Sequence, residues 1–209
     1  MMLQEFVGTP LTSKQIELLM ASPMKRTIQT CKISFAPVVE RGQRILLMPL
    51  AQESSDEPMD TGSTDEEITK EFGDLVDFHR LKDFPYWNRN VGQFDTTPEA
   101  RIERARKLRA EIRARPEKEI ALVTHGSFAH SITGNMTMEG EETTRMWQNA
   151  ECRTFTFNEE DEYAQLIETE ESKQRRPDIQ KRDSGYLVST DGKRRNSAGD
   201  LHNAEGGSP

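Results

Sequence analysis

The stretch IALVTHGS, residues 120–127, decides the fold class of this chain. Its first four residues, Ile120–Val123, form a short apolar run with β-branched residues at both ends. A charged PEKE segment precedes the run and Gly126 follows it, so we predict a buried strand over Ile120–Thr124. A helix is expected to begin directly afterwards, over Ser127–Ile132. A strand followed at once by a helix is typical of an α/β protein.

Two upstream apolar runs predict further buried strands, over Ile16–Ala21 and over Ile45–Leu50, the second ending early at Pro49. Helical patterns lie between the runs. One is expected over Lys25–Phe35, where Ser22 is a suitable cap and Pro23 a suitable first-turn residue. Strands that alternate with helices require crossover connections, which predicts a mainly parallel sheet.

The strongest helical pattern covers Pro98–Arg115, in which apolar residues recur every three or four positions. A last short helix is expected over Glu139–Trp147. Two more candidate strands, Thr154–Phe157 and Ala164–Ile167, predict an edge pair joined by an acidic turn at Asn158–Asp161.

The composition restricts the class of protein. The 209 residues are 33% hydrophobic and 31% charged, with a formal net charge of −8. An acidic chain is poorly suited to track nucleic-acid phosphates, so no nucleic-acid partner is expected. No window approaches the roughly 18 apolar residues of a membrane span. The two cysteines are far apart and no signal peptide is apparent, which favours a reducing, cytoplasmic location.

The polar residues are concentrated near the C-terminal end, which predicts three segments. Residues 1–15 are expected to form an irregular N-terminus and residues 16–168 the α/β domain. Residues 169–209 contain few large apolar side chains, and burial would not offset the entropy lost on ordering. They predict a disordered polar tail, with a short helix docked on the domain as the alternative.

Three strand ends carry the candidate functional residues. Arg26 lies in the first turn of a helix, Glu53 follows the second apolar run, and His125 follows the third. The carboxyl ends of parallel strands share one edge, so these side chains are expected to share a crevice. An arginine and a histidine that bind phosphate, with a carboxyl group that transfers a proton, suit phosphoryl chemistry. Each residue alone is open to a plainer interpretation as an ordinary surface or core side chain.

Four stretches together resemble the fungal branch of the histidine phosphatase, or phosphoglycerate mutase-like, superfamily. They are SPMKRTIQT (22–30), LAQESSDEPMDTGS (50–63), ALVTHGSFAHSITG (121–134) and WQNAECRTFTF (147–157). The resemblance implies a three-layer α/β/α sandwich on a mostly parallel sheet. It also implies phosphate-ester chemistry through a phosphohistidine, without a metal or other cofactor. By position it makes Arg26 a phosphate-binding arginine, Glu53 the proton donor and His125 the second histidine of the phosphate pocket.

The sequence departs from this family at the nucleophile. The family carries its nucleophilic histidine in an Arg-His-Gly motif near the start of the domain, and these 209 residues contain no such motif. We therefore expect an N-terminally incomplete domain with impaired activity. Three explanations stay open: a truncated gene model of an active enzyme, a pseudoenzyme, or a fragment completed by a partner.

Two functions follow as hypotheses. The first is hydrolysis of a small phosphorylated substrate, with Glu53 as the acid and Arg26 and His125 as the phosphate clamp. The second is binding of phosphate or a phosphorylated ligand without turnover. If His125 gains a proton near neutral pH, this binding should weaken above neutral pH. Neither the substrate nor the oligomeric state can be predicted from the sequence.

Overall fold

A four-stranded parallel sheet forms the centre of the molecule. The computed structural model describes residues 16–175. The strands lie in the order β3-β2-β1-β4 and all run in the same direction. Their bounds are β1 (Leu18–Ala21), β2 (Ile45–Leu47), β3 (Val76–Asp77) and β4 (Ile120–Val123). The sheet confirms the predicted α/β class, and β3 is a strand that the sequence analysis did not anticipate.

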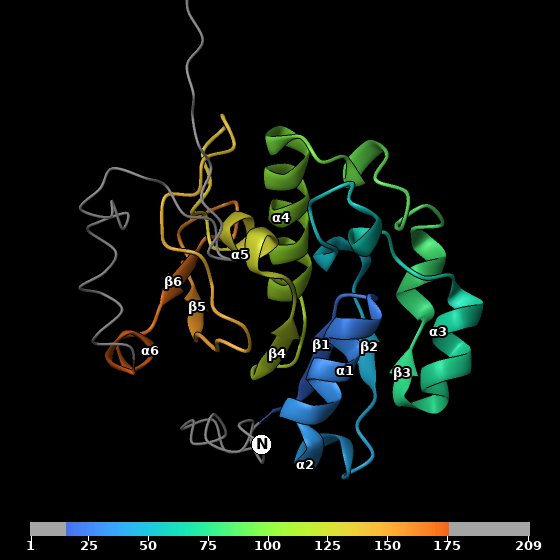
Figure 1. Cartoon of the computed structure of the whole chain (residues 1–209). Helices are drawn as coiled ribbons and strands as arrows, with labels where there is room; N and C mark the ends of the chain where they lie inside the picture. The colour runs from blue at the N-terminus through green and yellow to red at the C-terminus, as the bar shows by residue number, and fades with distance from the viewer. Residues whose placement is uncertain (1–15, 176–209) are drawn as a thin grey trace, which may run out of the picture.

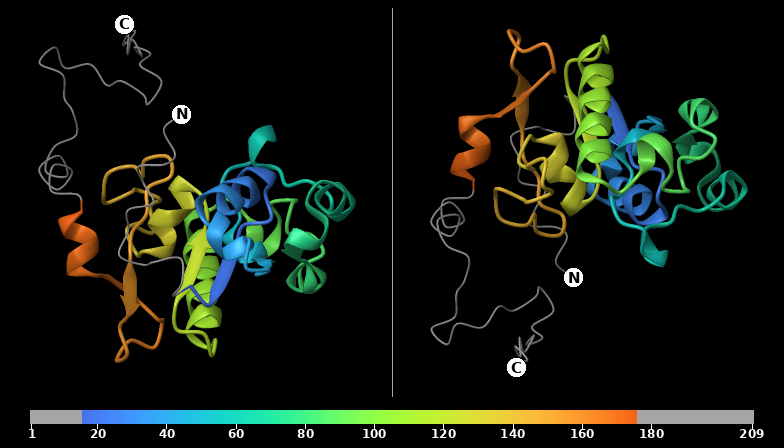
Figure 2. Two further views of the ribbon diagram at one scale, coloured as in Figure 1. Left: turned by 90° about the horizontal axis from the view of Figure 1, so that it is seen from below. Right: turned by 90° about the horizontal axis from the view of Figure 1, so that it is seen from above.

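Helices cover both faces of this sheet (Figures 1 and 2). In the two views of Figure 2, α1 and α4 lie on opposite sides of the strands, and α5 lies beside α4. The helices are α1 (Lys25–Ser34), α2 (Ala36–Val39), α3 (Asp65–Phe72), α4 (Pro98–Arg113) and α5 (Gly126–Ile132). In the described part of the chain, five short 3₁₀ turns lie between the strands and helices: Pro49–Ala51, Pro58–Asp60, Gly73–Leu75, His79–Asp83 and Gly92–Phe94.

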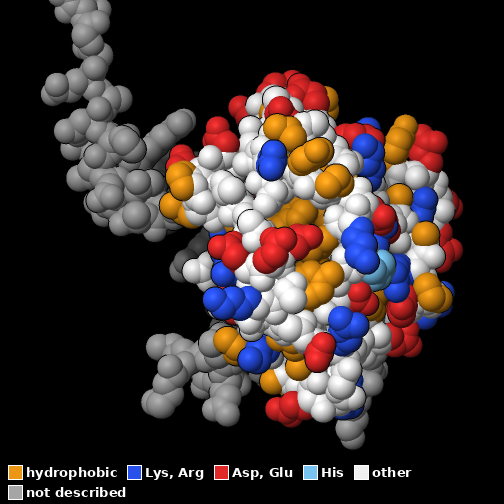
Figure 3. All heavy atoms as spheres, turned by 90° about the vertical axis from the view of Figure 1, so that its right-hand side faces the viewer, with side chains coloured by type: hydrophobic (Ala, Val, Ile, Leu, Met, Phe, Trp, Pro, Cys, Tyr) orange, Lys and Arg blue, Asp and Glu red, His pale blue; other side chains and the backbone are white. Residues whose placement is uncertain are grey.

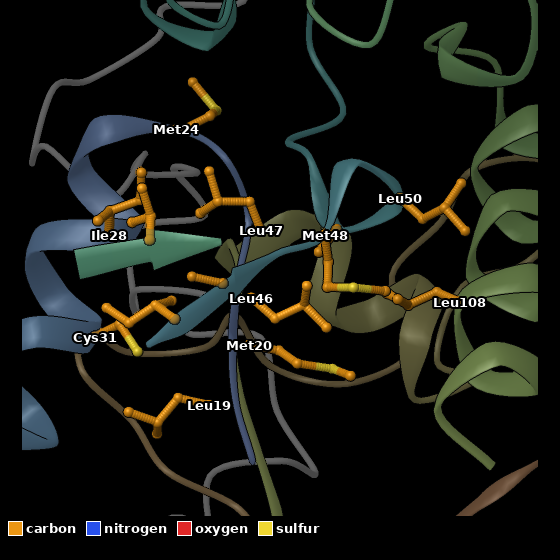
Figure 4. Close-up of a cluster of buried hydrophobic side chains, with 14 of the residues drawn as sticks. Leu19, Met20, Met24, Ile28, Cys31, Leu46, Leu47, Met48, Leu50 and Leu108 are labelled. Atoms are coloured by element: carbon orange, nitrogen blue, oxygen red, sulfur yellow. The ribbon is translucent and has the colours of Figure 1, made fainter. Parts of the chain in front are cut away.

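Alternation along the strands supplies two apolar layers of the core. Figure 4 shows Leu19 and Leu47 on the side of Ile28 and Cys31 in α1, whereas Met20 and Met48 lie toward Leu108 of α4. All seven side chains are at most 1% exposed. Successive residues of a strand point to opposite faces, so an uninterrupted apolar run is what a sheet covered on both faces requires.

A separate antiparallel hairpin lies beyond β4 (Figure 1). It consists of β5 (Phe155–Phe157) and β6 (Leu166–Glu168), followed by α6 (Glu170–Gln174). The predicted strand pair is confirmed, although it forms a sheet of its own. The tail prediction is wrong for residues 169–175, because Thr169 caps α6 by accepting from the backbone N–H of Ser172. Residues 1–15 and 176–209 lie outside the described part of the chain.

Two local predictions were wrong. Residues 139–147 form no helix. Gly140 has φ +86° and lies close to the Pro98 ring. Met136 and Glu142 form an isolated antiparallel β-bridge across this turn. Helix α1 begins after Met24 without a side-chain cap, so Ser22 does not cap it.

Helix α3 was missed although its sequence carries a start signal. Thr64 and Glu67 form a capping box, in which each side chain accepts a hydrogen bond from the backbone N–H of the other residue.

Within residues 16–175 no helix is long and apolar enough to cross a bilayer.

The two faces of α1 generate a prediction about stability. Ile28 is fully buried against the sheet, whereas Ile33 on the same helix is 55% exposed. Ile28→Ala should lower the free energy of unfolding by about 2–5 kcal/mol, because it removes buried methyl groups and leaves a cavity. Ile33→Ala, the same chemical change, should stay within about 0.5 kcal/mol. Urea unfolding measures both, and equal losses would contradict the assigned orientation of α1.

Candidate functional site

The three sequence-predicted residues meet at the carboxyl edge of the sheet. Arg26 lies in the first turn of α1, Glu53 follows the turn after β2, and His125 follows β4. The Arg26 guanidinium approaches Nδ1 of His125 through Nε at 3.3 Å and Nη2 at 3.1 Å. Oε2 of Glu53 lies 3.8 Å from the same Nδ1. Parallel pairing of β1 with β2 and β4 brings the three residues together across 99 residues of sequence.

The remaining donors of Arg26 are occupied by the loop after β2. Nη1 donates to the carbonyl of Met59 and Nη2 to Oδ1 of Asp60, both at 2.6 Å. The other oxygen of Asp60 accepts from the Ser55 hydroxyl. An arginine fork matches the geometry of a carboxylate or of a phosphate. Asp60 therefore occupies the position that an oxyanion bound to Arg26 would take.

His125 is almost fully buried, with 6% of its surface exposed. Its Nδ1 faces donors of Arg26, so Nδ1 accepts and Nε2 carries the hydrogen, which points to Oγ of Ser22 at 2.9 Å. Burial and then the charge of Arg26 lower the pKa of His125 to about 3. The imidazole is therefore neutral over the physiological pH range.

Glu53 is also held in a state that differs from that of a surface carboxylate. Burial raises its pKa, while the Ser54 N–H, which donates to Oε1 at 2.9 Å, acts in the opposite direction. Asp60 adds to the rise, and Arg26 and Arg101 oppose it. An ion pair would lower the pKa of Glu53 and raise that of His125, and both move the other way. Their 3.8 Å contact is therefore an approach of two groups that burial drives toward neutrality, and not a salt bridge.

This geometry corrects the expected pH dependence. The sequence analysis predicted that phosphate binding would weaken above neutral pH as His125 loses its proton. With a pKa of about 3, the imidazole has lost that proton long before neutral pH. Titration of His125 therefore gives no such dependence near neutral pH.

Two arginines of α4 complete the surroundings and were not singled out from the sequence. Arg104 reaches the loop beside Glu53, and Arg101 donates to the Ser127 hydroxyl at 2.8 Å. A signal existed, because Arg101, Arg104 and Leu108 follow the three-to-four spacing of a helix face. Arginines on the apolar side of a helix are unusual enough to mark buried charge.

The loop that carries Glu53 and Asp60 is fixed by the aromatic segment after α3. Gly62 packs on Trp87 so closely that a Cβ atom would lie 2.3 Å from the ring. Asn90 donates to the carbonyl of Ser55 at 3.0 Å and accepts from Gln52 at 2.7 Å. The loop leaves a cavity of about 190 Å³ beside Arg26, lined by Met24, Lys25, Arg26, Met59, Thr61, Gly62 and Ser63.

The other histidines of the described chain lie apart from this cluster. His79 is exposed, and its Nδ1 lies 2.9 Å from a carboxylate oxygen of Asp77. His130 is fully buried, with Nδ1 3.2 Å from the Thr144 hydroxyl and Nε2 3.4 Å from Glu142. Within residues 16–175 no group of three or more histidine, cysteine or acidic side chains is arranged to hold a metal ion.

Comparisons with known proteins show the family. The sequence model of the histidine phosphatase superfamily (branch 1) matches residues 4–170. A probable phosphatase of Schizosaccharomyces pombe is 30% identical over 112 residues, which are 53% of this chain and 51% of that protein. The chain thus spans about half the length of this relative. No solved structure matches the chain significantly.

The contact between Asp60 and Arg26 generates a prediction about anion binding. Asp60→Asn removes the carboxylate that competes for the guanidinium, so the affinity for inorganic phosphate should rise about tenfold, equivalent to about 1.4 kcal/mol. Calorimetric titration with phosphate measures this change. Asp56→Asn is the matched control, because Asp56 is exposed in the same loop and carries the same charge. An affinity of Asp60→Asn no higher than that of Asp56→Asn would contradict the competition.

Proposed function

The chain belongs to the histidine phosphatase superfamily, and from this premise we propose that its site takes part in phosphomonoester hydrolysis. The substrate class is a small phosphorylated molecule whose phosphoryl group enters beside Arg26. The observation that carries the proposal is the meeting of a guanidinium, an imidazole and a carboxyl group within 3.8 Å at one edge of the sheet. A cytoplasmic location stays a prediction.

Arg26 and His125 bind the phosphoryl group in this proposal. The guanidinium supplies charge-assisted hydrogen bonds once the phosphoryl oxygens replace Asp60. An anion next to Nδ1 favours a proton on that nitrogen. The Ser22 hydroxyl can then donate to Nε2 instead of accepting from it, because a hydroxyl serves in both roles. The imidazole thus changes tautomer and donates to the phosphoryl group without carrying a net charge.

Glu53 is the proton donor. Its raised pKa keeps the carboxyl group protonated at a higher pH than an ordinary glutamate. As the phosphoryl group passes to the attacking group and the P–O bond of the ester breaks, the carboxyl proton passes to the leaving oxygen, and the alcohol product departs neutral. In the family the attacking group is a histidine. Among the described residues His125 is the only histidine at this site, so the proposal assigns the described part of the chain to binding and acid catalysis.

Binding without turnover is the second candidate function. It is favoured by the absence, within residues 16–175, of a second histidine beside the clamp. It uses the same Arg26 and His125 contacts and requires no proton donor. The two functions differ in product release, and they share the prediction that Arg26 holds the anion.

Binding and turnover should be measured on the same samples. We expect inorganic phosphate to bind at pH 6, and Arg26→Ala to weaken it at least about tenfold, since hydrogen bonds to charged groups contribute about 1.5–3 kcal/mol. Lys32→Ala, an exposed cation on the same helix, is the control. Equal losses in both variants would refute the clamp. Release of nitrophenol from p-nitrophenyl phosphate separates the functions: hydrolysis predicts a rate that Arg26→Ala abolishes, and binding alone predicts none.

The buried Glu53 carboxyl generates a prediction about stability and pH. Its pKa is raised in the folded state, so this group reduces the stability of the protein as pH rises through that pKa. Glu53→Gln should therefore raise the melting temperature relative to the wild type at pH 8 more than at pH 5. Glu57→Gln is the matched control, since Glu57 is exposed in the same loop. If the difference in melting temperature between Glu53→Gln and the wild type stayed constant with pH, or if Glu57→Gln reproduced it, the raised pKa of Glu53 would be contradicted.

A further inference from the structure

Arg104 is a fully buried arginine in the middle of α4. No salt bridge joins it to an acidic side chain within residues 16–175, and its Nε and Nη1 atoms are buried without hydrogen-bond partners. Burial lowers its pKa to about 9. A buried charge without a counter-ion is costly, so the contacts that retain it here are informative.

Those contacts converge on the main chain around Glu53. Nη2 of Arg104 donates to the carbonyl of Gln52 at 3.1 Å and to that of Glu53 at 3.3 Å. The same nitrogen lies 3.2 Å from the Ser54 hydroxyl. The guanidinium also stacks over Phe128, 4.2 Å from the ring centroid. One side chain thus ties α4 to three consecutive residues of the loop that carries the proton donor.

A second buried arginine of the same helix shows what a purely structural contact would look like. Arg109 is 7% exposed and donates to the carbonyls of Ser131, Ile132 and Tyr163 at 3.1–3.3 Å. Both arginines bind main-chain carbonyls from one helix. Only the contacts of Arg104 include the loop of Glu53, so the pair separates a general packing role from a role at the site.

We propose that Arg104 is a positioning residue, which holds residues 52–54 so that the Glu53 carboxyl group points at the phosphoryl site beside His125. The inference rests on the proposed function, in which Glu53 is the proton donor. A carboxyl group on a loop transfers a proton efficiently only if the loop is fixed to within a fraction of an ångström. Without Arg104, three buried acceptors lose their donor and the loop is free to turn Glu53 toward water.

Burial and the charged groups around Glu53 determine how its pKa would change if the loop were freed. Asp60 raises the pKa of Glu53, whereas Arg26 and Arg101 lower it, and burial outweighs each of them. The charges of Arg104 and Glu53 also attract each other, so loss of the Arg104 charge would by itself raise the pKa of Glu53, and a fall in that pKa would report a turned carboxyl group. The charge of Arg104 also adds to the lowering of the pKa of His125. Since burial is the largest cause at Glu53, a carboxyl group that turns into solvent should regain a pKa closer to the ordinary glutamate range.

The test compares Arg104→Met with Arg109→Met, which remove the same group from two buried positions of one helix. The Glu53 carboxyl carbon is followed by ¹³C NMR through a pH titration of the full chain. We expect its pKa to fall in Arg104→Met and to remain raised in Arg109→Met, although both variants lose stability. A pKa that is unchanged or higher in Arg104→Met overturns the proposal. Arg104→Lys, which keeps the charge on a shorter side chain, serves if Arg104→Met does not fold, with the same direction expected.

A second readout uses the leaving group. Phenyl phosphate needs the acid more than p-nitrophenyl phosphate does, because phenoxide is the poorer leaving group. If the wild type hydrolyses both, Arg104→Met should lose about tenfold more activity on phenyl phosphate, and Arg109→Met should lose equally on both. If Arg104→Met lost activity equally on phenyl phosphate and on p-nitrophenyl phosphate, the positioning role would be overturned. A wild type without turnover would count against hydrolysis and leave the NMR result to decide on Arg104.

Discussion

Parallel pairing of β1 with both β2 and β4 is the constraint on which this site depends. Met48 donates to the carbonyl of Ala21 and Ser22 to that of Val123, so the pairing continues past the ends of the strands. Three segments must then leave the sheet at one edge. Each adds one functional group there, and none of the three would meet the others in an antiparallel arrangement with short hairpins. The apolar layers that hold α1 and α4 against the sheet therefore also determine where the chemistry is located.

Burial at this edge controls protonation more strongly than pairing does. Glu53 and His125 approach within 3.8 Å, yet burial raises the pKa of one and lowers that of the other. The positive charges of Arg26 and Arg104 add to the effect at His125. The site therefore combines a carboxyl group whose pKa burial raises, a neutral imidazole, and a guanidinium that Asp60 holds in place.

The sequence predicted the sheet and the site better than the connections between them. Ile120–Val123 and Ile45–Leu47 were recognisable because strands buried on both faces are continuous apolar runs. The convergence of Arg26, Glu53 and His125 followed from the rule that parallel strands end together. The helix expected over 139–147 does not form, and Gly140 within that stretch has φ +86°, which a right-handed helix does not accommodate. Asp60 was not predictable, because its contact with Arg26 depends on a loop folded against Trp87, and no periodic pattern encodes such a loop.

The same loop joins the two arginines that define the site. Its beginning, at residues 52–54, is held by Arg104 from α4, and its far end, at Met59 and Asp60, is held by Arg26 from α1. These helices lie on opposite faces of the sheet (Figure 2), so the loop spans the edge between the two layers.

The face around α3 carries acidic and basic side chains side by side, with no large patch of a single sign (Figure 3). In the proposed function an incoming anion meets the exposed Arg26 at the edge of the sheet, and its first competitor is the loop itself, through Asp60. In this proposal the release of Asp60 frees the far end of the loop, while the contacts of Arg104 keep Glu53 in place. The proposed ligand entry and proton donation would then use one loop, because its two ends are tied to different helices.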